Sequence, residues 1–176
     1  MKVRRVVTGQ VDGGRSVFVS DEEVEPIAPA ITPGIEYHRL WGSDQIPKLP
    51  TEGSPPSQHP YFPPAGGFRW GLFTLPPGPV SPPEGIDIAA ALAEFEEKLP
   101  GLAGHMERDN PGMHTTDTVD FEVVLSGEIW LELDDGAEVH LKAGDTVVQN
   151  GTRHRWSNKG TEPVVVAVGL IGATRG

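Results

Sequence analysis

Short apolar segments separated by turn residues dominate the second half of the chain. Within most of them apolar and polar side chains alternate, which is the pattern of a β-strand with one buried face. The turns between them are rich in Gly, Asp and Asn, which favour tight reversals of the backbone. Strands of this length at this spacing predict an all-β sandwich or barrel. The predicted strands are residues 68–75, 118–125, 129–133, 137–141, 146–149, 153–157 and 164–171.

The first third of the chain has a different pattern. Apolar residues flank an Asp-Gly-Gly turn at residues 12–14 and predict a hairpin around it. A further strand is expected at 35–41, and the segment 42–67, rich in Pro, Gly and Ser, is expected to be an extended loop. We therefore divide the chain into two parts. Residues 1–67 form an N-terminal arm of extra strands that packs on the barrel or on a partner subunit, and residues 68–176 form the barrel.

One segment between the predicted strands has helical periodicity instead. Its apolar residues recur at steps of four, three and four positions, which places them on one face of a helix. A short inserted helix is therefore expected at about residues 86–99. Ser81 and Asp87 are the two candidate N-caps, and Pro100-Gly101 ends the helix. The four apolar residues are Ile88, Leu92, Phe95 and Leu99.

Composition limits the classes of function that are open to this chain. A length of 176 residues without an internal repeat predicts one barrel, and 22 Gly and 18 Pro residues imply many turns. The formal net charge of −11 argues against nucleic acid and an anionic membrane surface as partners, because both are bound through basic residues. The chain has no cysteine, which excludes disulfides, thiolate metal sites and a Cys nucleophile. Together with the lack of a secretory leader, this predicts a cytoplasmic protein.

Several polar residues that could carry chemistry lie in or beside these apolar strands. Alternate residues of a strand share a face, so His114, Thr116 and Asp120 are expected to point the same way. His154 and Trp156 share a face of a later strand for the same reason. Two imidazoles and a carboxylate inside a barrel suit a divalent metal such as Zn, Fe, Mn or Ni. We therefore predict a metal site formed by His114, Asp120 and His154, with open positions for water or substrate.

The same residues resemble the two sequence motifs of the cupin superfamily. The segment from His114 to Asp120, followed after six residues by Gly127, resembles the first motif, G-x5-H-x-H-x3,4-E-x6-G. The segment from Gly144 to Asn158 resembles the second motif, G-x5-P-x-G-x2-H-x3-N, and its G-x2-H-x3-N half matches in full. The resemblance implies a single cupin barrel, a double-stranded β-helix or jelly roll, and a homodimer that forms through the N-terminal arm.

The first motif departs from the family pattern at two ligand positions. Thr116 stands where the second histidine is expected, and Asp120 replaces the longer glutamate, whereas His114 and His154 match. The resemblance therefore implies a metal site that has lost one ligand, so that the metal binds weakly, recruits another ligand or is absent. The candidate replacement ligands near the first motif are His105, Glu107 and Asp117.

Two classes of function remain open at this point. In the first, a cupin-type enzyme acts on a small molecule in the barrel through a divalent metal, or through His154 and Asp120 as an acid–base pair. Lyase, dehydratase, decarboxylase and oxygenase chemistry all fit this class. In the second, the same pocket binds a small ligand without catalysis, which the missing histidine favours. The pocket is expected to be lined by Thr116, Trp156 and Trp70.

Overall fold

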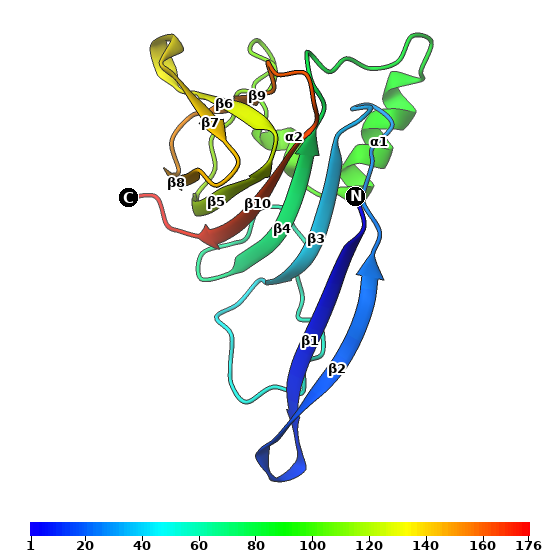
Figure 1. Cartoon of the computed structure of the whole chain (residues 1–176), viewed down its shortest axis with the longest axis vertical. Coiled ribbons are helices and arrows are strands. Elements are labelled where there is room, and N and C mark those ends of the chain that lie inside the picture. The colour runs from blue at the N-terminus through cyan, green and yellow to red at the C-terminus, as the bar shows by residue number, and fades with distance from the viewer.

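The computed structural model describes residues 1–176, which form three antiparallel sheets and two α-helices. Five strands form the largest sheet in the order β3-β4-β10-β5-β8, and three form a second sheet in the order β7-β6-β9. The hairpin β1-β2 is a separate two-stranded sheet. It projects from one end of the molecule, away from the other strands (Figure 1). The prediction of an all-β barrel with an N-terminal strand arm and an inserted helix is confirmed.

The strands predicted between residue 35 and the C-terminus are all present, with ends that differ by no more than two residues. Short 3-10 turns occupy Asp12–Gly14 and Asp134–Gly136. Neither α-helix has the length and apolar character that a membrane-spanning helix needs. The helices are α1 (Ile88–Lys98) and α2 (Leu102–His105). The strands are β1 (Val3–Val11), β2 (Arg15–Val24), β3 (Glu36–Ser43), β4 (Phe68–Leu75), β5 (Thr118–Ser126), β6 (Glu128–Glu132), β7 (Glu138–Lys142), β8 (Thr146–Asn150), β9 (Arg155–Ser157) and β10 (Val164–Gly172).

The main hydrophobic core lies between the five-stranded and the three-stranded sheet. It is formed by alternate apolar residues of β5, β6, β7 and β10, which is the arrangement that the alternating pattern of these strands predicts. Burial of these side chains holds the two sheets together. The core residues are Val124, Ile129, Leu131, Leu141, Val164 and Val166.

The inner face of β5 is identified by Val124, which belongs to this core. Because side chains alternate along a strand, Glu122 and Asp120 share the inner face with Val124. The register places Asp120 opposite Gln149 of β8, and Glu122 opposite Val168 of β10. One half of the barrel interior is therefore filled by apolar side chains, and the continuation of the same strand carries acidic groups into the other half.

Helix α1 begins after Asp87, whose side chain accepts a hydrogen bond from the Ala90 N–H at 3.1 Å. Asp87 and not Ser81 is therefore the N-cap. The sequence correctly places the end of this helix before Pro100-Gly101, but it does not predict α2. Gly101 has a φ of 82°, a conformation that glycine adopts readily, and this lets the chain turn at once into a second helix.

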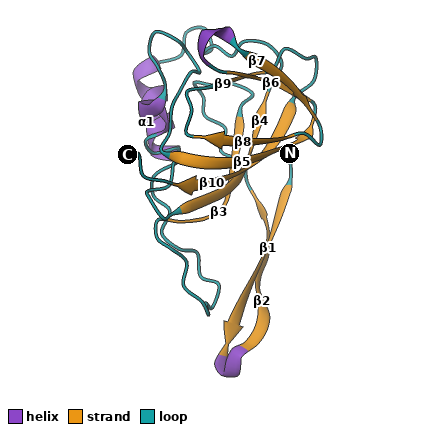
Figure 2. Cartoon of the chain, turned by 90° about the vertical axis from the view of Figure 1, so that its left-hand side faces the viewer, coloured by secondary structure: helices purple, strands orange, loops and turns teal.

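Only the C-terminal half of the predicted apolar face of α1 is buried. Phe95 and Leu99 are buried, whereas Ile88 and Leu92 are about half exposed. The buried residues connect α1 and α2 with the loop that precedes β4 and with β3. The helix thus lies at the side of the barrel (Figure 2), where it covers part of the interior. The residues packed around Phe95 and Leu99 include Leu102, Tyr37, Tyr61, Phe62 and Met106.

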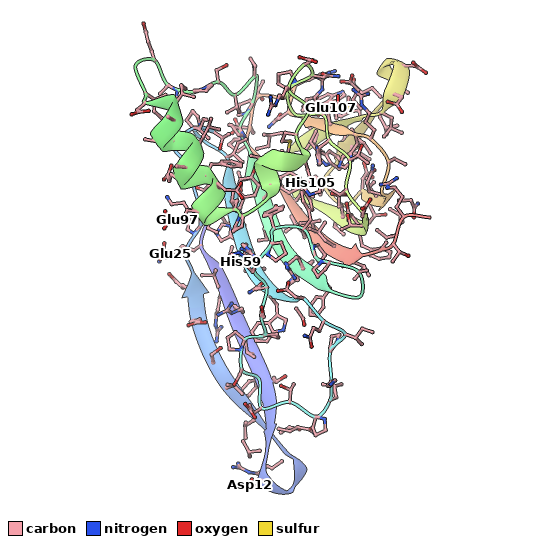
Figure 3. The ribbon with its side chains drawn as sticks, turned by 180° about the vertical axis from the view of Figure 1, so that it is seen from behind. Asp12, Glu25, His59, Glu97, His105 and Glu107 are labelled. Carbon is pink, nitrogen blue, oxygen red and sulfur yellow. The ribbon has the colours of Figure 1, made fainter.

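The N-terminal arm is tied to the sheet at two places. Strand β3 pairs with β4 and is thereby part of the five-stranded sheet. The base of the β1-β2 hairpin packs on the opposite, outer face of that sheet, where Val3 and Val24 contact Leu40 and Leu72. The tip of the hairpin, marked by Asp12 in Figure 3, lies far from this contact.

Candidate functional site

His114 and His154 lie side by side in neighbouring segments of the barrel. The two residues form an antiparallel bridge in which each backbone N–H donates to the other backbone carbonyl at 2.9 Å. Their ring centroids are 4.2 Å apart. Each Nδ1 bonds a backbone carbonyl, that of Gly112 at 3.0 Å for His114 and that of Thr152 at 2.9 Å for His154. Because Nδ1 then carries the proton, the lone pair of each ring is on Nε2.

Burial keeps both imidazoles neutral. It lowers the pKa of His154 to about 4, with a further contribution from the neighbouring His114. Burial also lowers the pKa of His114, although the hydrogen bond to the Gly112 carbonyl opposes this shift. Two neutral rings can lie this close together without electrostatic repulsion. Each ring therefore presents an Nε2 acceptor at neutral pH.

A pair of carboxyl groups lies on the inner face of β5. Asp120 is 3% exposed and Glu122 is 5% exposed. Oδ1 of Asp120 and Oε2 of Glu122 are buried and have no hydrogen-bond partner in the protein. Burial of an unpartnered polar group is costly, so these two oxygens mark a place that suits a hydrogen-bond donor from water or a ligand.

The environment of this pair shifts both carboxyl pKa values upward. Burial raises the pKa of Asp120 to about 6, and the hydroxyl of Thr118 partly opposes this shift. Burial and the neighbouring Asp120 raise the pKa of Glu122 to about 8. Tyr61 lies near both acids, and its own burial raises its pKa further above the usual range, so the phenol stays neutral. At neutral pH the two carboxyl groups together hold about one proton.

Glu122 was not among the residues predicted for the site. The alternation that places Asp120 on the inner face places Glu122 there too, because the two residues are two positions apart on the same strand. The signal was therefore present in the sequence, but the first cupin motif ends its ligand positions at Asp120. Tyr61 could not have been found in this way, because it lies in a loop without periodicity.

The structure brings two of the three predicted metal ligands together. His114 and His154 meet, but no group of three or more His, Cys, Asp or Glu side chains is placed to hold a metal ion. Asp120 is one methylene shorter than the glutamate of the motif, and it lies with Glu122 on the inner face of β5. The donors that are present therefore do not fit the three-ligand metal site predicted from the sequence.

Two of the three residues predicted as replacement ligands, Glu107 and Asp117, are engaged in ion pairs, and the third, His105, forms no metal-holding group with the two imidazoles. Both carboxylate oxygens of Glu107 pair with Arg153, at 2.6 and 2.7 Å. Asp117 pairs with Arg175 at 2.7 Å. Nδ1 of His105 lies 3.1 Å from a backbone carbonyl oxygen. Figure 3 shows His105 on α2 and Glu107 just beyond this helix. None of the three forms a three-ligand metal site together with the two imidazoles.

The three predicted pocket residues lie in different environments. Thr116 is buried, and its hydroxyl is 2.8 Å from that of Thr118. The ring of Trp156 lies 6.2 Å from that of His154, so this side chain stays next to the imidazole pair. Trp70 is 45% exposed and lies on the outer face of the sheet, because Phe73 and Leu75, which have the opposite parity in β4, pack against the main core. Trp70 therefore does not line the barrel interior.

The fold and this site define a small β-barrel protein with polar groups directed into the barrel. Residues 106–170 match a family model described as "Cupin_2: Cupin domain". This match includes both imidazoles and both acids, and it agrees with the motifs that resemble those of cupins. Residues 106–170 are thus similar to a cupin domain.

Two curated relatives match a short segment of the chain. Phomopsin biosynthesis cluster protein C' of Diaporthe leptostromiformis is 53% identical over 47 residues, which are 27% of this chain and 25% of the relative. Oryzines biosynthesis cluster protein J of Aspergillus oryzae is 50% identical over 48 residues, which are 27% of each chain. The match thus spans about a quarter of the length of these relatives.

A solved structure shows the fold over almost the whole chain. The cupin domain of Cnp3 from Schizosaccharomyces pombe aligns with 98% of this chain and 89% of its own, with a TM-score of 0.50 and 10% identity. At this level of identity the likeness shows the fold alone.

Proposed function

We propose that this protein is an enzyme that performs acid–base chemistry on a small organic molecule inside the barrel. The observation that carries the proposal is the buried pair Asp120 and Glu122, each with a carboxyl oxygen that lacks a partner. Environments that displace the pKa values of neighbouring carboxyl groups are typical of acid–base sites. With pKa values of about 6 and about 8, one group accepts and the other donates a proton near neutral pH.

The roles of the individual groups follow from these protonation states. Asp120 acts as general base and removes a proton from a carbon next to a carbonyl group. Glu122 acts as general acid and gives its proton to a leaving hydroxyl, so that water departs and a carbon–carbon double bond forms. The proton on Asp120 then returns to Glu122, which restores both groups. His154, neutral and with Nε2 as acceptor, orients a hydroxyl of the substrate. This is a reaction of the lyase and dehydratase type.

We favour this route over a metal-dependent one because of the donor set. The two imidazoles alone provide fewer ligands than the three protein ligands usual in a catalytic zinc site. The relatives offer further support for a small-molecule substrate, since both are named after biosynthesis clusters, of phomopsin and of oryzines. As part of the proposal, we extend to the present chain only this role in the biosynthesis of a small molecule.

Hydrogen–deuterium exchange at carbon tests the proposed reaction. The full chain in D2O is expected to introduce deuterium into members of a panel of small hydroxy- and keto-carboxylic acids, because the base that removes a proton returns a deuteron from solvent. Proton NMR follows the loss of the C–H signal. We expect Asp120→Asn to slow the exchange by about 100-fold or more, since general base catalysis contributes factors of about 10²–10⁴.

Asp117→Asn is the matched control for this experiment. Asp117 is an exposed carboxylate paired with Arg175, three positions before Asp120, so this variant should exchange at the wild-type rate. An unchanged rate in Asp120→Asn contradicts the proposal. Panel members that bind to the wild type without exchange favour the second candidate function, a ligand-binding cupin without catalysis. The loss of the second motif histidine supports this candidate as well.

Metal analysis tests the fit of the donor set separately. Protein purified without a His tag, dialysed against Zn²⁺, Fe²⁺, Mn²⁺ or Ni²⁺ and then against metal-free buffer, is expected to retain well below one equivalent. Two imidazoles leave most positions of the metal to water, which holds it weakly. The metal content should be the same in His154→Ala. One retained equivalent that His154→Ala abolishes, measured by mass spectrometry of the elements, contradicts the expectation.

A further inference from the structure

Arg39 of β3 is a partly buried cation without an anionic partner. Its Nη2 donates to the backbone carbonyls of Gln58 and Pro60, the latter at 3.3 Å. Its Nε and Nη1 form no hydrogen bond within the protein, and it belongs to no ion pair, whereas most arginines of this chain pair with a carboxylate. Buried charges are normally paired, because an unpaired charge is costly to remove from water. The guanidinium of Arg39 thus has both a charge and free N–H groups for an anion.

A second arginine adds to the positive charge at this place. Arg69 also donates to the carbonyl of Pro60, at 2.8 Å, so the two guanidinium groups converge on one residue. Asp44 is the only carboxylate that pairs with either of them, and it pairs with Arg69. Burial lowers the pKa of Arg39, and the neighbouring Arg69 lowers it further. Two cations with one carboxylate leave one uncompensated positive charge, although the whole chain has a net charge of −11.

Arg39 lies in the same row of the five-stranded sheet as Glu122. The register aligns Arg39 of β3 with Gly71 of β4. Gly71 is aligned with Val168 of β10, which is aligned with Glu122 of β5. This row belongs to the inner face, because Phe73, two positions after Gly71, packs against the main core. The four strands lie side by side (Figure 1), and three strand spacings of about 4.8 Å place the cation and the acid about 14 Å apart, measured along the backbone of the sheet.

The two arginines line a cavity of about 20 Å³, which has room for a group of about the size of one water molecule. Val168 and Leu170 line the same cavity. The register aligns these two residues with Glu122 and Asp120, respectively, so the cavity reaches the part of the sheet that carries the carboxyl pair. One oxygen of a carboxylate is about as large as a water molecule and suits this space.

Two neutral polar side chains complete the wall of the cavity, those of Tyr61 and Gln58. Burial raises the pKa of the Tyr61 phenol and the carboxyl pair acts in the same direction, whereas the charge of Arg39 acts against the rise. The phenol is therefore close to the cation and to the acids. Oε1 of Gln58 is buried and has no partner, and an amide offers both an acceptor and donors. A few placed polar groups beside a charged one are typical of sites that orient a small ligand.

We propose that Arg39 binds the carboxylate of the substrate, which extends from there across Val168 to the carboxyl pair. This inference rests on the proposed acid–base function and assigns the substrate to the organic acids that are held by this group. An anion that enters an acidic chain and approaches two acids needs a cation to offset the repulsion, and Arg39 is the cation without a partner on this face. A phosphate group has more oxygens and a higher charge than the small cavity and one free cation accommodate.

Binding measurements on matched acids and esters test the proposal. Each hydroxy- and keto-carboxylic acid of the panel is compared with its uncharged methyl ester by isothermal titration calorimetry at pH 7. The wild type is expected to bind at least one acid about tenfold or more tightly than its ester, because hydrogen bonds between charged groups are about twice as strong as neutral ones. Arg39→Met should remove this preference by weakening the binding of the acid, with the affinity for the ester unchanged.

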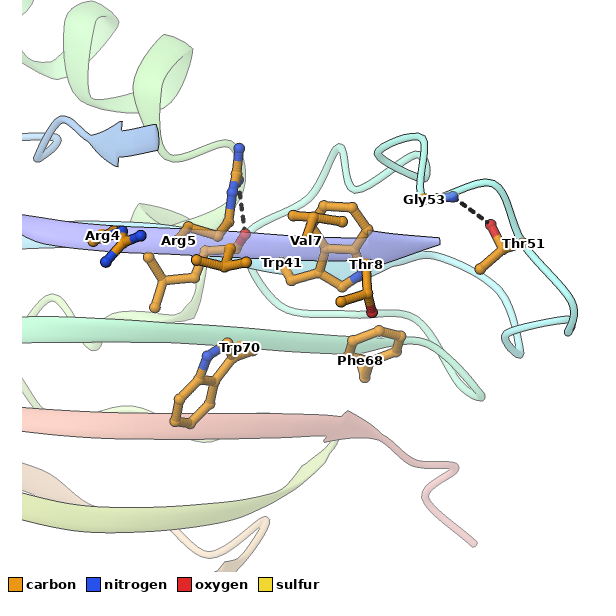
Figure 4. A pocket seen from close by; sticks show the side chains of 11 residues that line it. Arg4, Arg5, Val7, Thr8, Trp41, Thr51, Gly53, Phe68 and Trp70 are labelled. Atoms are coloured by element: carbon orange, nitrogen blue, oxygen red, sulfur yellow. Dashed lines mark hydrogen bonds between the residues drawn. The ribbon is translucent and has the colours of Figure 1, made fainter. Parts of the chain in front are cut away.

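Arg5→Met is the matched control. Arg5 is also partly buried and donates to a backbone carbonyl, that of Leu40 at 2.8 Å, but it pairs with Glu22 and lies at the outer cleft between β1 and the sheet (Figure 4). This variant should keep the preference of the wild type for the acid. Circular dichroism compares the folding of the variants. Arg39→Gln, which also lacks the charge but can still donate to the loop, replaces Arg39→Met if the latter does not fold.

Equal affinities of the wild type for acids and esters overturn the proposal, and so does a preference that persists in the uncharged Arg39 variant. Inorganic phosphate that binds to the wild type more tightly than any acid of the panel overturns the assignment to a carboxylate. The outcomes for the proposed function are distinct. Deuterium exchange at equal rates in acids and esters supports acid–base catalysis and overturns the role of Arg39. A preference for acids without exchange supports the carboxylate site and contradicts the catalysis.

Discussion

Replacement of Glu122 by glutamine is expected to stabilise the protein at pH 7 by up to about 3 kcal/mol. The pKa of Glu122 rises from 4.5 to about 8 in the fold, and each pKa unit corresponds to about 1.4 kcal/mol. A carboxyl group whose pKa is higher in the folded than in the unfolded chain contributes stability fully below the unfolded value. That stability is lost as the pH rises toward the folded value. Glutamine has a similar shape but no charge to bury, so the variant avoids this loss.

The test is the free energy of unfolding of the wild type and of Glu122→Gln, measured by urea denaturation from pH 5 to pH 8. The advantage of Glu122→Gln should be small near pH 5 and should grow with pH across this window. Glu97→Gln is the control, because Glu97 is an exposed glutamate of α1 (Figure 3) and should behave as the wild type at every pH. A constant difference between Glu122→Gln and the wild type across the window would falsify the assignment of Glu122 as a buried acid.

Replacement of Arg69 by methionine is expected to destabilise the fold by about 3–5 kcal/mol, the range found when one partner of a buried ion pair is removed. Arg69 is buried, and its guanidinium donates to the backbone carbonyls of Ser43 and Phe68 at 2.9 Å and to that of Pro60 at 2.8 Å. It also pairs with Asp44. These contacts tie both ends of the loop between β3 and β4 to the sheet, so the variant leaves several buried acceptors without a donor.

Urea denaturation at a fixed pH measures this loss, and limited proteolysis reports on the loop. We expect new cleavage between residues 44 and 60 in Arg69→Met, because this segment is no longer held at the sheet. Arg4→Met is the control, since Arg4 pairs with Asp21 on the exposed surface of the hairpin and should contribute little. A loss of unfolding free energy as small as that of Arg4→Met would show that the loop is held by its apolar residues and not by Arg69.

The Arg69 contacts also connect the fold with the candidate site. The loop that Arg69 holds leads directly to Tyr61, which lies near Asp120 and Glu122. The position of Tyr61 near the carboxyl pair therefore depends on an arginine of β4. Nothing in the local sequence marks this arginine, because its partners are backbone carbonyls from distant positions.

Much of the architecture was predictable because the signals for it are local. Alternation of apolar and polar residues predicted the barrel strands to within two residues at their ends. The sequence offered both Ser81 and Asp87 as the N-cap of α1, since the side chain of either residue can accept a backbone hydrogen bond. Packing of Phe95 and Leu99 sets the position of the helix and thereby selects Asp87.

The grouping of the site residues was only partly predictable. His114 and His154 meet as the motifs imply, because a backbone bridge joins their segments. Asp120 shares its strand face with Glu122, and the two acids together form the second polar group of the barrel. A sequence motif states the order of ligands but not the reach of each side chain, and the replacement of glutamate by aspartate changes that reach.

The sequence by itself determined the strands, the single barrel and the residue types that enter it, because each of these depends on the spacing of side chains along one strand. The tertiary structure alone decided which polar groups meet, which face Trp70 takes and how far the hairpin extends. Those outcomes depend on strand register and on the packing of distant segments. Side chains far apart in sequence are brought within a few ångströms only by the order of the strands in the sheet.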